Sequence, residues 1–350
     1  MLEFYKNKKV FITGHTGFKG TWLSRILINA GAEVTGYALE SPTEPSLFHL
    51  TATEGEMHSF MGDIRDYDRL SKCMDQARPD VVFHLAAQPL VRLSYEQPVE
   101  TYSTNVMGTV NLLESVRKTP SVRSCVNVTT DKVYENKEWL WGYREDENLS
   151  GYDPYSNSKS CSELVTSSYR NSFFSKSDSA AISTARSGNV IGGGDFAQDR
   201  IIPDCVRATM ANKEIVIRNP NSIRPYQHVL ECLSGYLLLA KRQYEDKTYS
   251  GAYNFGPLED DCITTGQLVE MFCSSWEGAT WKVQGDGGPH EANFLKLDCS
   301  KSKTILKWTP KWSIFEAVDS VVKWYENFGS HEIESKEITD YQITSYFNHE

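Results

Sequence analysis

Near the start of the chain lies the stretch Lys9-Val10-Phe11-Ile12-Thr13-Gly14-His15-Thr16-Gly17-Phe18-Lys19-Gly20. Its first half is typical of a buried β-strand, and apolar residues at helical spacing follow from Trp22 to Asn29. Glycines between a strand and a helix let the backbone turn sharply and approach a pyrophosphate, which the helix N-terminus attracts. The glycines here are spaced Gly-x-x-Gly-x-x-Gly rather than Gly-x-Gly-x-x-Gly. The stretch therefore predicts the phosphate loop of a dinucleotide-binding α/β domain.

Short apolar runs alternate with helical patterns through the first half of the chain. Strands are expected at residues 33–39, 57–61, 81–86, 125–129 and 180–186, with one more at 252–255. Residues 105–117 have the pattern of a helix between two of these strands. Such alternation predicts βαβ units with right-handed crossovers. The expected fold class is therefore α/β: a Rossmann-type doubly wound parallel sheet with a smaller, interleaved C-terminal substrate domain.

The alternation breaks after Arg186, where glycines and prolines crowd the chain as far as Pro225. Amphipathic helices are expected later, at residues 265–276 and 314–328. The predicted division has a dinucleotide-binding domain, a substrate domain and a C-terminal tail, at residues 1–186 with about 229–257, about 187–228 with 258–330, and 331–350. The tail is polar, and we expect it to be poorly ordered from about Ser330.

Composition and charge exclude several classes of protein. The formal net charge of −10 argues against a nucleic-acid or acidic-membrane surface, since both require clustered Lys and Arg. No apolar stretch is long enough to span a bilayer, and the N-terminus lacks the layout of a signal peptide. The eight cysteines are scattered and the histidines lack metal-ligand spacing. We therefore expect a cytoplasmic protein without a metal and without membrane or nucleic-acid partners.

Two short motifs carry candidate catalytic groups. Tyr155 and Lys159 are four residues apart and would share one face of a helix. A free tyrosine is too weak an acid to serve as a base at neutral pH, and a neighbouring ammonium lowers its pKa. Thr130 and Asp131 follow a predicted strand, and ligands of open parallel sheets bind beyond the carboxyl ends of strands. We interpret Thr130 as a partner for a substrate hydroxyl and Asp131 as the acid that protonates a leaving hydroxide.

Together these features resemble the extended short-chain dehydrogenase/reductase superfamily and, within it, the sugar-nucleotide 4,6-dehydratases. The resemblance runs from about Lys6 to Trp324. Most of these dehydratases have Thr-Asp-Glu, whereas the third residue here is Lys132, as in the CDP-glucose branch. The segments that match this branch are His15-Thr16-Gly17-Phe18-Lys19-Gly20, His84-Leu85-Ala86-Ala87-Gln88-Pro89-Leu90-Val91-Arg92, Thr130-Asp131-Lys132-Val133-Tyr134 and Arg186-Ser187-Gly188-Asn189-Val190-Ile191-Gly192-Gly193-Gly194-Asp195.

The resemblance implies an NAD-dependent lyase that converts CDP-D-glucose to CDP-4-keto-6-deoxy-D-glucose and water, as in 3,6-dideoxyhexose and O-antigen biosynthesis. It implies that Tyr155, with Lys159 beside it, takes the proton of the C4 hydroxyl while a hydride moves from C4 to NAD, and that Thr130 bonds to the substrate hydroxyl. Asp131 then expels the C6 hydroxyl as water, and NADH returns its hydride to C6. Lys132 is left to take the C5 proton, which requires a depressed pKa.

The resemblance also implies binding residues. For NAD they are Gly14, Thr16, Gly17, Phe18, Lys19, Gly20, Asp63, Ile64, Leu85, Ala86, Ala87, Thr104, Thr129, Tyr155 and Lys159. For the nucleotide sugar they are Gln88, Ser94, Asn189, Arg200, Arg224 and His228. Asp63 would contact the adenine amino group, unless it only caps the helix that begins near Tyr67. The helices at 101–117 and 154–172 would pair with a second subunit in a homodimer or homotetramer.

Three alternatives stay open at this stage. A sugar-nucleotide 4-epimerase would share the phosphate loop and Tyr-x-x-x-Lys but has no use for an acid such as Asp131. Dehydratases of dTDP-glucose or GDP-mannose would be expected to carry glutamate in place of Lys132. A non-catalytic NAD-sensing protein on the same fold would commonly lack Tyr155 or Lys159.

Overall fold

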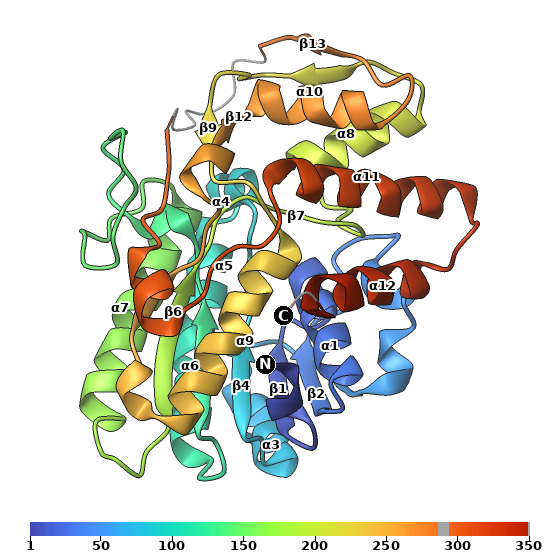
Figure 1. Ribbon diagram of the computed structural model, residues 1–350. Coiled ribbons are helices and arrows are strands. Elements are labelled where there is room, and N and C mark those ends of the chain that lie inside the picture. The colour runs from blue at the N-terminus through green and yellow to red at the C-terminus, as the bar shows by residue number, and fades with distance from the viewer. Residues whose placement is uncertain (286–293, 349–350) are drawn as a thin grey trace.

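The computed structural model describes residues 1–285 and 294–348 (Figure 1). At its centre is a seven-stranded sheet in the order β11-β6-β5-β4-β1-β2-β3, in which every neighbouring pair is parallel. The predicted doubly wound parallel sheet is confirmed. Its strands are β1 (Lys9–Thr13), β2 (Glu33–Ala38), β3 (His58–Met61), β4 (Val81–His84), β5 (Ser124–Val128), β6 (Ala181–Arg186) and β11 (Ala252–Asn254).

The central strands are apolar on both faces because the sheet has a core on each side. In β1, Val10 and Ile12 belong to one hydrophobic cluster and Phe11 to the other. Successive side chains of a strand point to opposite faces, so a continuous apolar run is what a sheet covered on both sides requires.

Helices cover both faces of the sheet (Figure 1). α3, α6 and α7 pack together on one face, whereas α1 and α9 pack together on the other. Among the described residues, no helix has both the length and the apolar character needed to cross a membrane. The helices are α1 (Phe18–Asn29), α2 (Leu47–Leu50), α3 (Tyr67–Ala77), α4 (Val91–Glu96), α5 (Pro98–Tyr102), α6 (Gly108–Lys118), α7 (Pro154–Phe173), α8 (Ile201–Met210), α9 (Val229–Glu245), α10 (Thr265–Ser275), α11 (Ile314–Ser330) and α12 (Ser335–Asn348).

A smaller layer lies beyond one end of the sheet, where α8, α10 and α11 stand at the top of Figure 1. Between its parts the chain returns to the sheet, since α9 packs on β5 and β6 and β11 pairs with β6. The exact domain boundaries stay a prediction. Two-stranded sheets of this layer and its junction are formed by β7 (Val190–Ile191) with β10 (Gln227–His228), β9 (Ile223–Arg224) with β12 (Ile263–Thr264), and β8 (Ile215–Ile217) with β13 (Trp281–Val283).

The prediction of a poorly ordered tail from about Ser330 is wrong. α12 packs against α1 and α11, with Ile338, Ile343, Tyr346 and Phe347 buried. Arg25 of α1 donates to Asp340 at 2.6 Å, which fixes the helix through a charge-assisted bond. The tail is therefore part of the core that covers this face of the sheet.

Candidate active site

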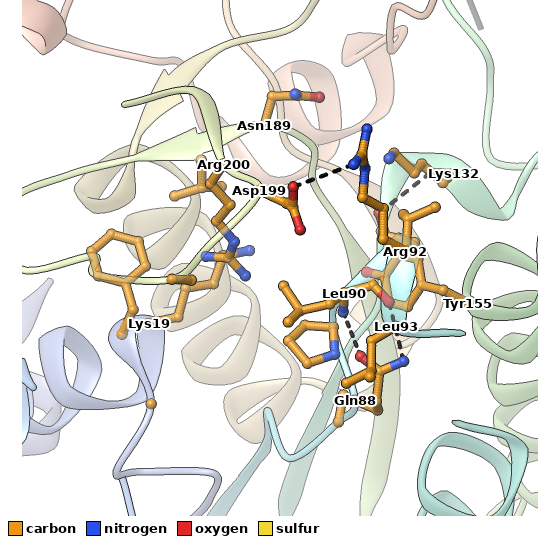
Figure 2. A pocket seen from close by; sticks show the side chains of 18 of the residues that line it. Lys19, Gln88, Leu90, Arg92, Leu93, Lys132, Tyr155, Asn189, Asp199 and Arg200 are labelled. Carbon is orange, nitrogen blue, oxygen red and sulfur yellow. Dashed lines mark hydrogen bonds and ion pairs between the residues drawn. The ribbon is translucent and has the colours of Figure 1, made fainter. Parts of the chain in front are cut away.

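A cavity of about 2420 Å³ lies at the carboxyl ends of the central strands (Figure 2). Open parallel sheets bind their ligands at this edge. Of the residues predicted from the sequence, the structure brings these to its walls: Gly14, Thr16, Gly17, Phe18, Lys19, Gly20, Asp63, Ile64, Leu85, Ala86, Ala87, Gln88, Thr104, Thr129, Thr130, Asp131, Lys132, Tyr155, Lys159, Asn189, Arg200 and Arg224.

The phosphate loop is a cradle made of backbone. Gly14 has a φ of +77°, and a Cβ there would lie 2.7 Å from the backbone nitrogen of Ala86. A Cβ on Gly20 would lie 2.0 Å from the carbonyl oxygen of Gly14. α1 begins at Phe18 without a side-chain cap, so its first N–H groups face the loop. Only glycine fits these positions, and the open helix end suits a pyrophosphate.

Asp63 is held by a fork from Arg65, whose Nε lies 2.9 Å from Oδ1. The guanidinium keeps the pKa of this carboxyl below its usual range. The alternative that Asp63 only caps the next helix is wrong, because α3 begins at Tyr67 and is capped by Asp66. The carboxylate of Asp63 thus lines the cavity as a charged group.

Tyr155 and Lys159 lie on the first turns of α7, which Asp153 caps by accepting from the backbone N–H of Ser156. The Nζ of Lys159 donates to the carbonyl oxygen of Val128, at the end of β5, over 3.2 Å. Burial lowers the pKa of Lys159 to about 8. Both side chains therefore line the cavity from one face of α7, as the four-residue spacing predicts.

The expected lowering of the Tyr155 pKa is not found. Burial raises the pKa of Tyr155 to about 12, against the opposing effects of a hydrogen bond with Thr130 and the charge of Arg200. Lys159 is directed to the Val128 carbonyl, so its charge does not offset the loss of solvent around the phenol. Tyr155 is therefore a neutral phenol at neutral pH in this structure.

Thr130, Asp131 and Lys132 form a tight corner after β5. Thr130 caps a 3₁₀ turn, and its hydroxyl donates to Oδ1 of Asp131 over 2.9 Å. The other oxygen, Oδ2, is buried and has no hydrogen-bond partner among the residues that the structure describes. A Cβ on Gly188 would lie 2.0 Å from that oxygen, so glycine gives Asp131 its place. Lys132 lines the same cavity as Tyr155 and Arg92, and all three are labelled in Figure 2.

The sugar-nucleotide side of the cavity is polar. Arg200 donates to Oδ2 of Asp195 over 2.8 Å, which orients its guanidinium. Asn189 has a φ of +35°, and its Oδ1 is a buried atom without a hydrogen-bond partner in the described part of the chain. The side chain of Gln88 bonds to Leu90 and Thr101, so it shapes the loop after β4. These groups can orient an anionic ligand.

Two predicted substrate residues do not line the cavity. Ser94 is fully buried and donates to the carbonyl oxygen of Val91 within α4. His228 is also fully buried, with its ring 5.8 Å from that of Trp22 and 4.8 Å from that of Trp312. Burial lowers the pKa of His228 to about 3, and its Nδ1 accepts from the N–H of Leu230 at the start of α9. Both side chains are therefore buried in the protein interior and are not part of the cavity lining.

The sequence interpretation missed a buried ion pair next to the candidate catalytic groups. Glu163 and Arg186 form it, with both side chains only 3% exposed. The available signal was spacing, because Glu163 comes four residues after Lys159 on the same helix. Arg186 gave no such signal, since it ends an apolar strand.

A phosphate loop, a Tyr-x-x-x-Lys pair and an acid at the end of β5 define an enzyme of the short-chain dehydrogenase/reductase class. Over residues 11–321 the sequence matches the profile of the GDP-mannose 4,6 dehydratase family. The CDP-glucose 4,6-dehydratase of Salmonella typhimurium strain LT2 is 51% identical over 349 residues, with 97% of each chain covered. The chain belongs to this dehydratase family.

Solved structures share the fold. The dTDP-glucose 4,6-dehydratase of Bacillus anthracis, determined in complex with NAD, is 22% identical with a TM-score of 0.76, over 91% of this chain and 96% of its own. The UDP-glucose 4-epimerase of Thermus thermophilus, also with NAD, is 23% identical with a TM-score of 0.79, over 91% and 98%. One fold thus carries dehydratases and epimerases, and the site must separate them.

Proposed function

We propose that this protein is an NAD-dependent dehydratase that converts CDP-glucose to CDP-4-keto-6-deoxyglucose and water. The observation that carries the proposal is the buried carboxyl of Asp131, which lies beside Thr130 in the cavity that Tyr155 lines. An epimerase has no step for such an acid. Lys132, together with the 51% identity to a CDP-glucose 4,6-dehydratase, favours the CDP sugar over dTDP-glucose and GDP-mannose.

The residues present fit NAD. The glycine cradle and the start of α1 would hold its pyrophosphate, Asp63 its adenine amino group, and Lys159 its nicotinamide ribose. When bound, NAD takes a hydride from C4 of the sugar and gives it back at C6, so the reaction has no net redox change.

The side chains divide the proton transfers among them. Tyr155 receives the proton of the C4 hydroxyl, which Thr130 orients. The C4 ketone acidifies the proton on C5, and Lys132 accepts that proton in its free-amine form. Asp131, in its protonated form, gives its proton to the C6 hydroxyl, which leaves as water. Because Tyr155 is a neutral phenol in this structure, its base form depends on Lys159 turning its charge toward the phenol when ligands bind.

The nucleotide end of the substrate would lie against the polar wall. Arg200 and Arg224 are suited to a diphosphate, because a guanidinium offers paired donors in a fixed plane. Asn189 adds a buried amide. The preference for cytosine rests on the relative's substrate.

The test is direct. Incubation of the protein with CDP-glucose should give a 4-keto product, seen by its absorbance in alkali, without consumption of added NAD. Formation of CDP-galactose instead would favour the epimerase. Parallel incubations with dTDP-glucose and GDP-mannose test the nucleotide, and faster turnover of either would overturn the CDP assignment.

A second subunit is also proposed, as a homodimer or a homotetramer. The helical segments 98–118 and 154–173 leave large apolar side chains exposed, among them Val99, Met107, Leu164 and Phe173. Apolar surface of this kind on adjacent helices is typical of a subunit interface. Light scattering in solution would decide, and the mass of a single chain would contradict the proposal.

A further inference from the structure

Glu163 and Arg186 form a buried ion pair next to the proposed catalytic groups. Neither side chain lines the cavity. Arg186 ends β6 and forks onto Glu163 of α7, with Nε 2.9 Å from Oε1 and Nη2 2.9 Å from Oε2. Thr184 donates to the same carboxylate over 2.7 Å. Arg186 also neutralises the carboxylate, so the pair is charge-balanced, a condition that buried ions require.

This pair holds both flanks of the catalytic corner. Before the corner, the hydroxyl of Thr129 donates to Oε1 of Glu163 over 2.5 Å. After it, Nη1 of Arg186 donates to the hydroxyl of Tyr134 over 2.8 Å, and Tyr134 in turn donates to Asn254 of β11. Residues 130–132 therefore lie between two residues, Thr129 and Tyr134, that are both hydrogen-bonded to the same ion pair.

The same pair acts on Lys159, one helical turn before Glu163. Lys159 bonds to the carbonyl oxygen of Val128, and the next residue, Thr129, bonds to Glu163, so α7 is joined to the end of β5 at two successive residues. Charged and titratable groups face Lys159 from three elements. Lys19 of α1 lowers the Lys159 pKa and Glu163 raises it, while buried His84 of β4 is neutral, with a pKa of about 3.

We propose that Glu163, fixed by Arg186, is a positioning residue that sets residues 130–132 against Tyr155 and keeps Lys159 protonated. The inference rests on the proposed dehydratase reaction and adds a residue that touches neither substrate nor cofactor. Besides Arg186, the charge of Arg170 on α7 also faces Glu163. Glu163 is thus the negative group that offsets the surrounding cations.

The test compares three variants with the wild type. In Glu163→Gln the charge is lost, so the alkaline limb of kcat/KM should move to lower pH by about one unit. In Glu163→Asp the charge remains but the side chain is shorter. The alkaline limb of kcat/KM should therefore stay at the same pH, while kcat falls at least about tenfold and KM does not change. Thr184→Val removes one bond to Oε2 of the same carboxylate, whereas Thr129 bonds to Oε1, so both quantities should stay as in the wild type.

A second readout does not depend on turnover. The rate at which a small anhydride acylates Lys159, followed by mass spectrometry against pH, reports the free amine directly. Its midpoint should fall in Glu163→Gln by the same amount as the kinetic limb and stay unchanged in Glu163→Asp. In Glu163→Gln, an equal loss of activity at every pH, with the kinetic limb and the acylation midpoint both unmoved, would show a merely structural role and overturn the inference.

Two outcomes separate this inference from the proposed function. If the wild type does not convert CDP-glucose, the proposed function fails, and the acylation midpoints still test the effect of Glu163 on Lys159. If Glu163→Gln does not fold by circular dichroism, Glu163→Asp decides alone, and an unchanged kcat in that variant overturns the inference.

Discussion

The two halves of the active-site cavity differ in the groups that line them, which are backbone in one half and polar side chains in the other. The cofactor half, from the end of β1 to the start of α1, is made of backbone, and Gly14 and Gly20 keep it free of side chains. The catalytic half, at the ends of β5 and β6, is made of buried polar groups such as Thr130, Asp131 and Lys159. The cofactor half has no room for added side-chain atoms, whereas the catalytic half depends on the charges of its buried side chains. Substitutions should therefore fail in different ways: added volume should break the first, and altered protonation the second.

The largest effect is expected for Gly20→Ala. Its Cβ would lie 2.0 Å from the carbonyl oxygen of Gly14, and the backbone of Gly14 and His15 cannot move aside as a flexible side chain would. We expect a loss of about 3 kcal/mol or more in the free energy of unfolding, at the upper end of the range for overpacking, and no measurable NAD binding. Denaturant unfolding and calorimetric titration with NAD measure the two quantities.

The matched control is Gly55→Ala. A Cβ at Gly55 meets nothing within 4 Å, so stability and NAD binding should both be unchanged. Equal behaviour of the two variants would mean that the loop is not a steric cradle.

The backbone half could be predicted from local sequence, because a turn between a strand and a helix leaves its signature in adjacent residues. The strands were predictable for the same reason. α12 was not, because its buried stripe mixes Ile338 and Ile343 with Thr339 and Gln342, and the side chain of each polar residue makes a hydrogen bond to α11. Only the packed partner shows that these polar residues face inward.

The catalytic half was predictable only in part. Sequence position placed Tyr155, Lys159 and Asp131 near one another, because strand ends meet at one edge of a sheet. It did not give the direction of each side chain, so Ser94 and His228 were assigned to the substrate although they pack behind the cavity. It also gave the wrong direction for the pKa of Tyr155, since burial is a property of the whole fold.

An intermediate effect is expected for Asp131→Asn. The amide keeps the shape and the bond from Thr130 but cannot give a proton to the leaving hydroxyl, so water loss should slow by about 100- to 10,000-fold. Hydride transfer from C4 should persist, and reduced nicotinamide should accumulate on the enzyme and be visible by its absorbance. Unchanged turnover would remove Asp131 from the mechanism.

Asp199→Asn is the control for this change. Asp199 lies at the cavity wall, half exposed, and pairs with Arg92 at 3.7 Å. An exposed pair of this length contributes little, and asparagine tolerates the positive φ of +57° at this position. Its turnover should match the wild type.

The smallest effect is expected for Lys159→Met, which tests how much stability the buried charge of the catalytic half costs. Burial lowers the pKa of Lys159 from 10.5 to about 8, so between these values the unfolded chain binds more protons than the folded one. Stability contributed at this site therefore rises with pH over that window, and the folded state carries the full penalty of a buried charge below pH 8. Lys159→Met removes the penalty together with the bond to Val128, so it should be more stable than the wild type at neutral pH by about 1–3 kcal/mol while losing turnover. Its advantage in denaturant unfolding should shrink as the pH rises through the window; a constant difference between the two proteins across that range would mean that Lys159 is not held as a buried cation.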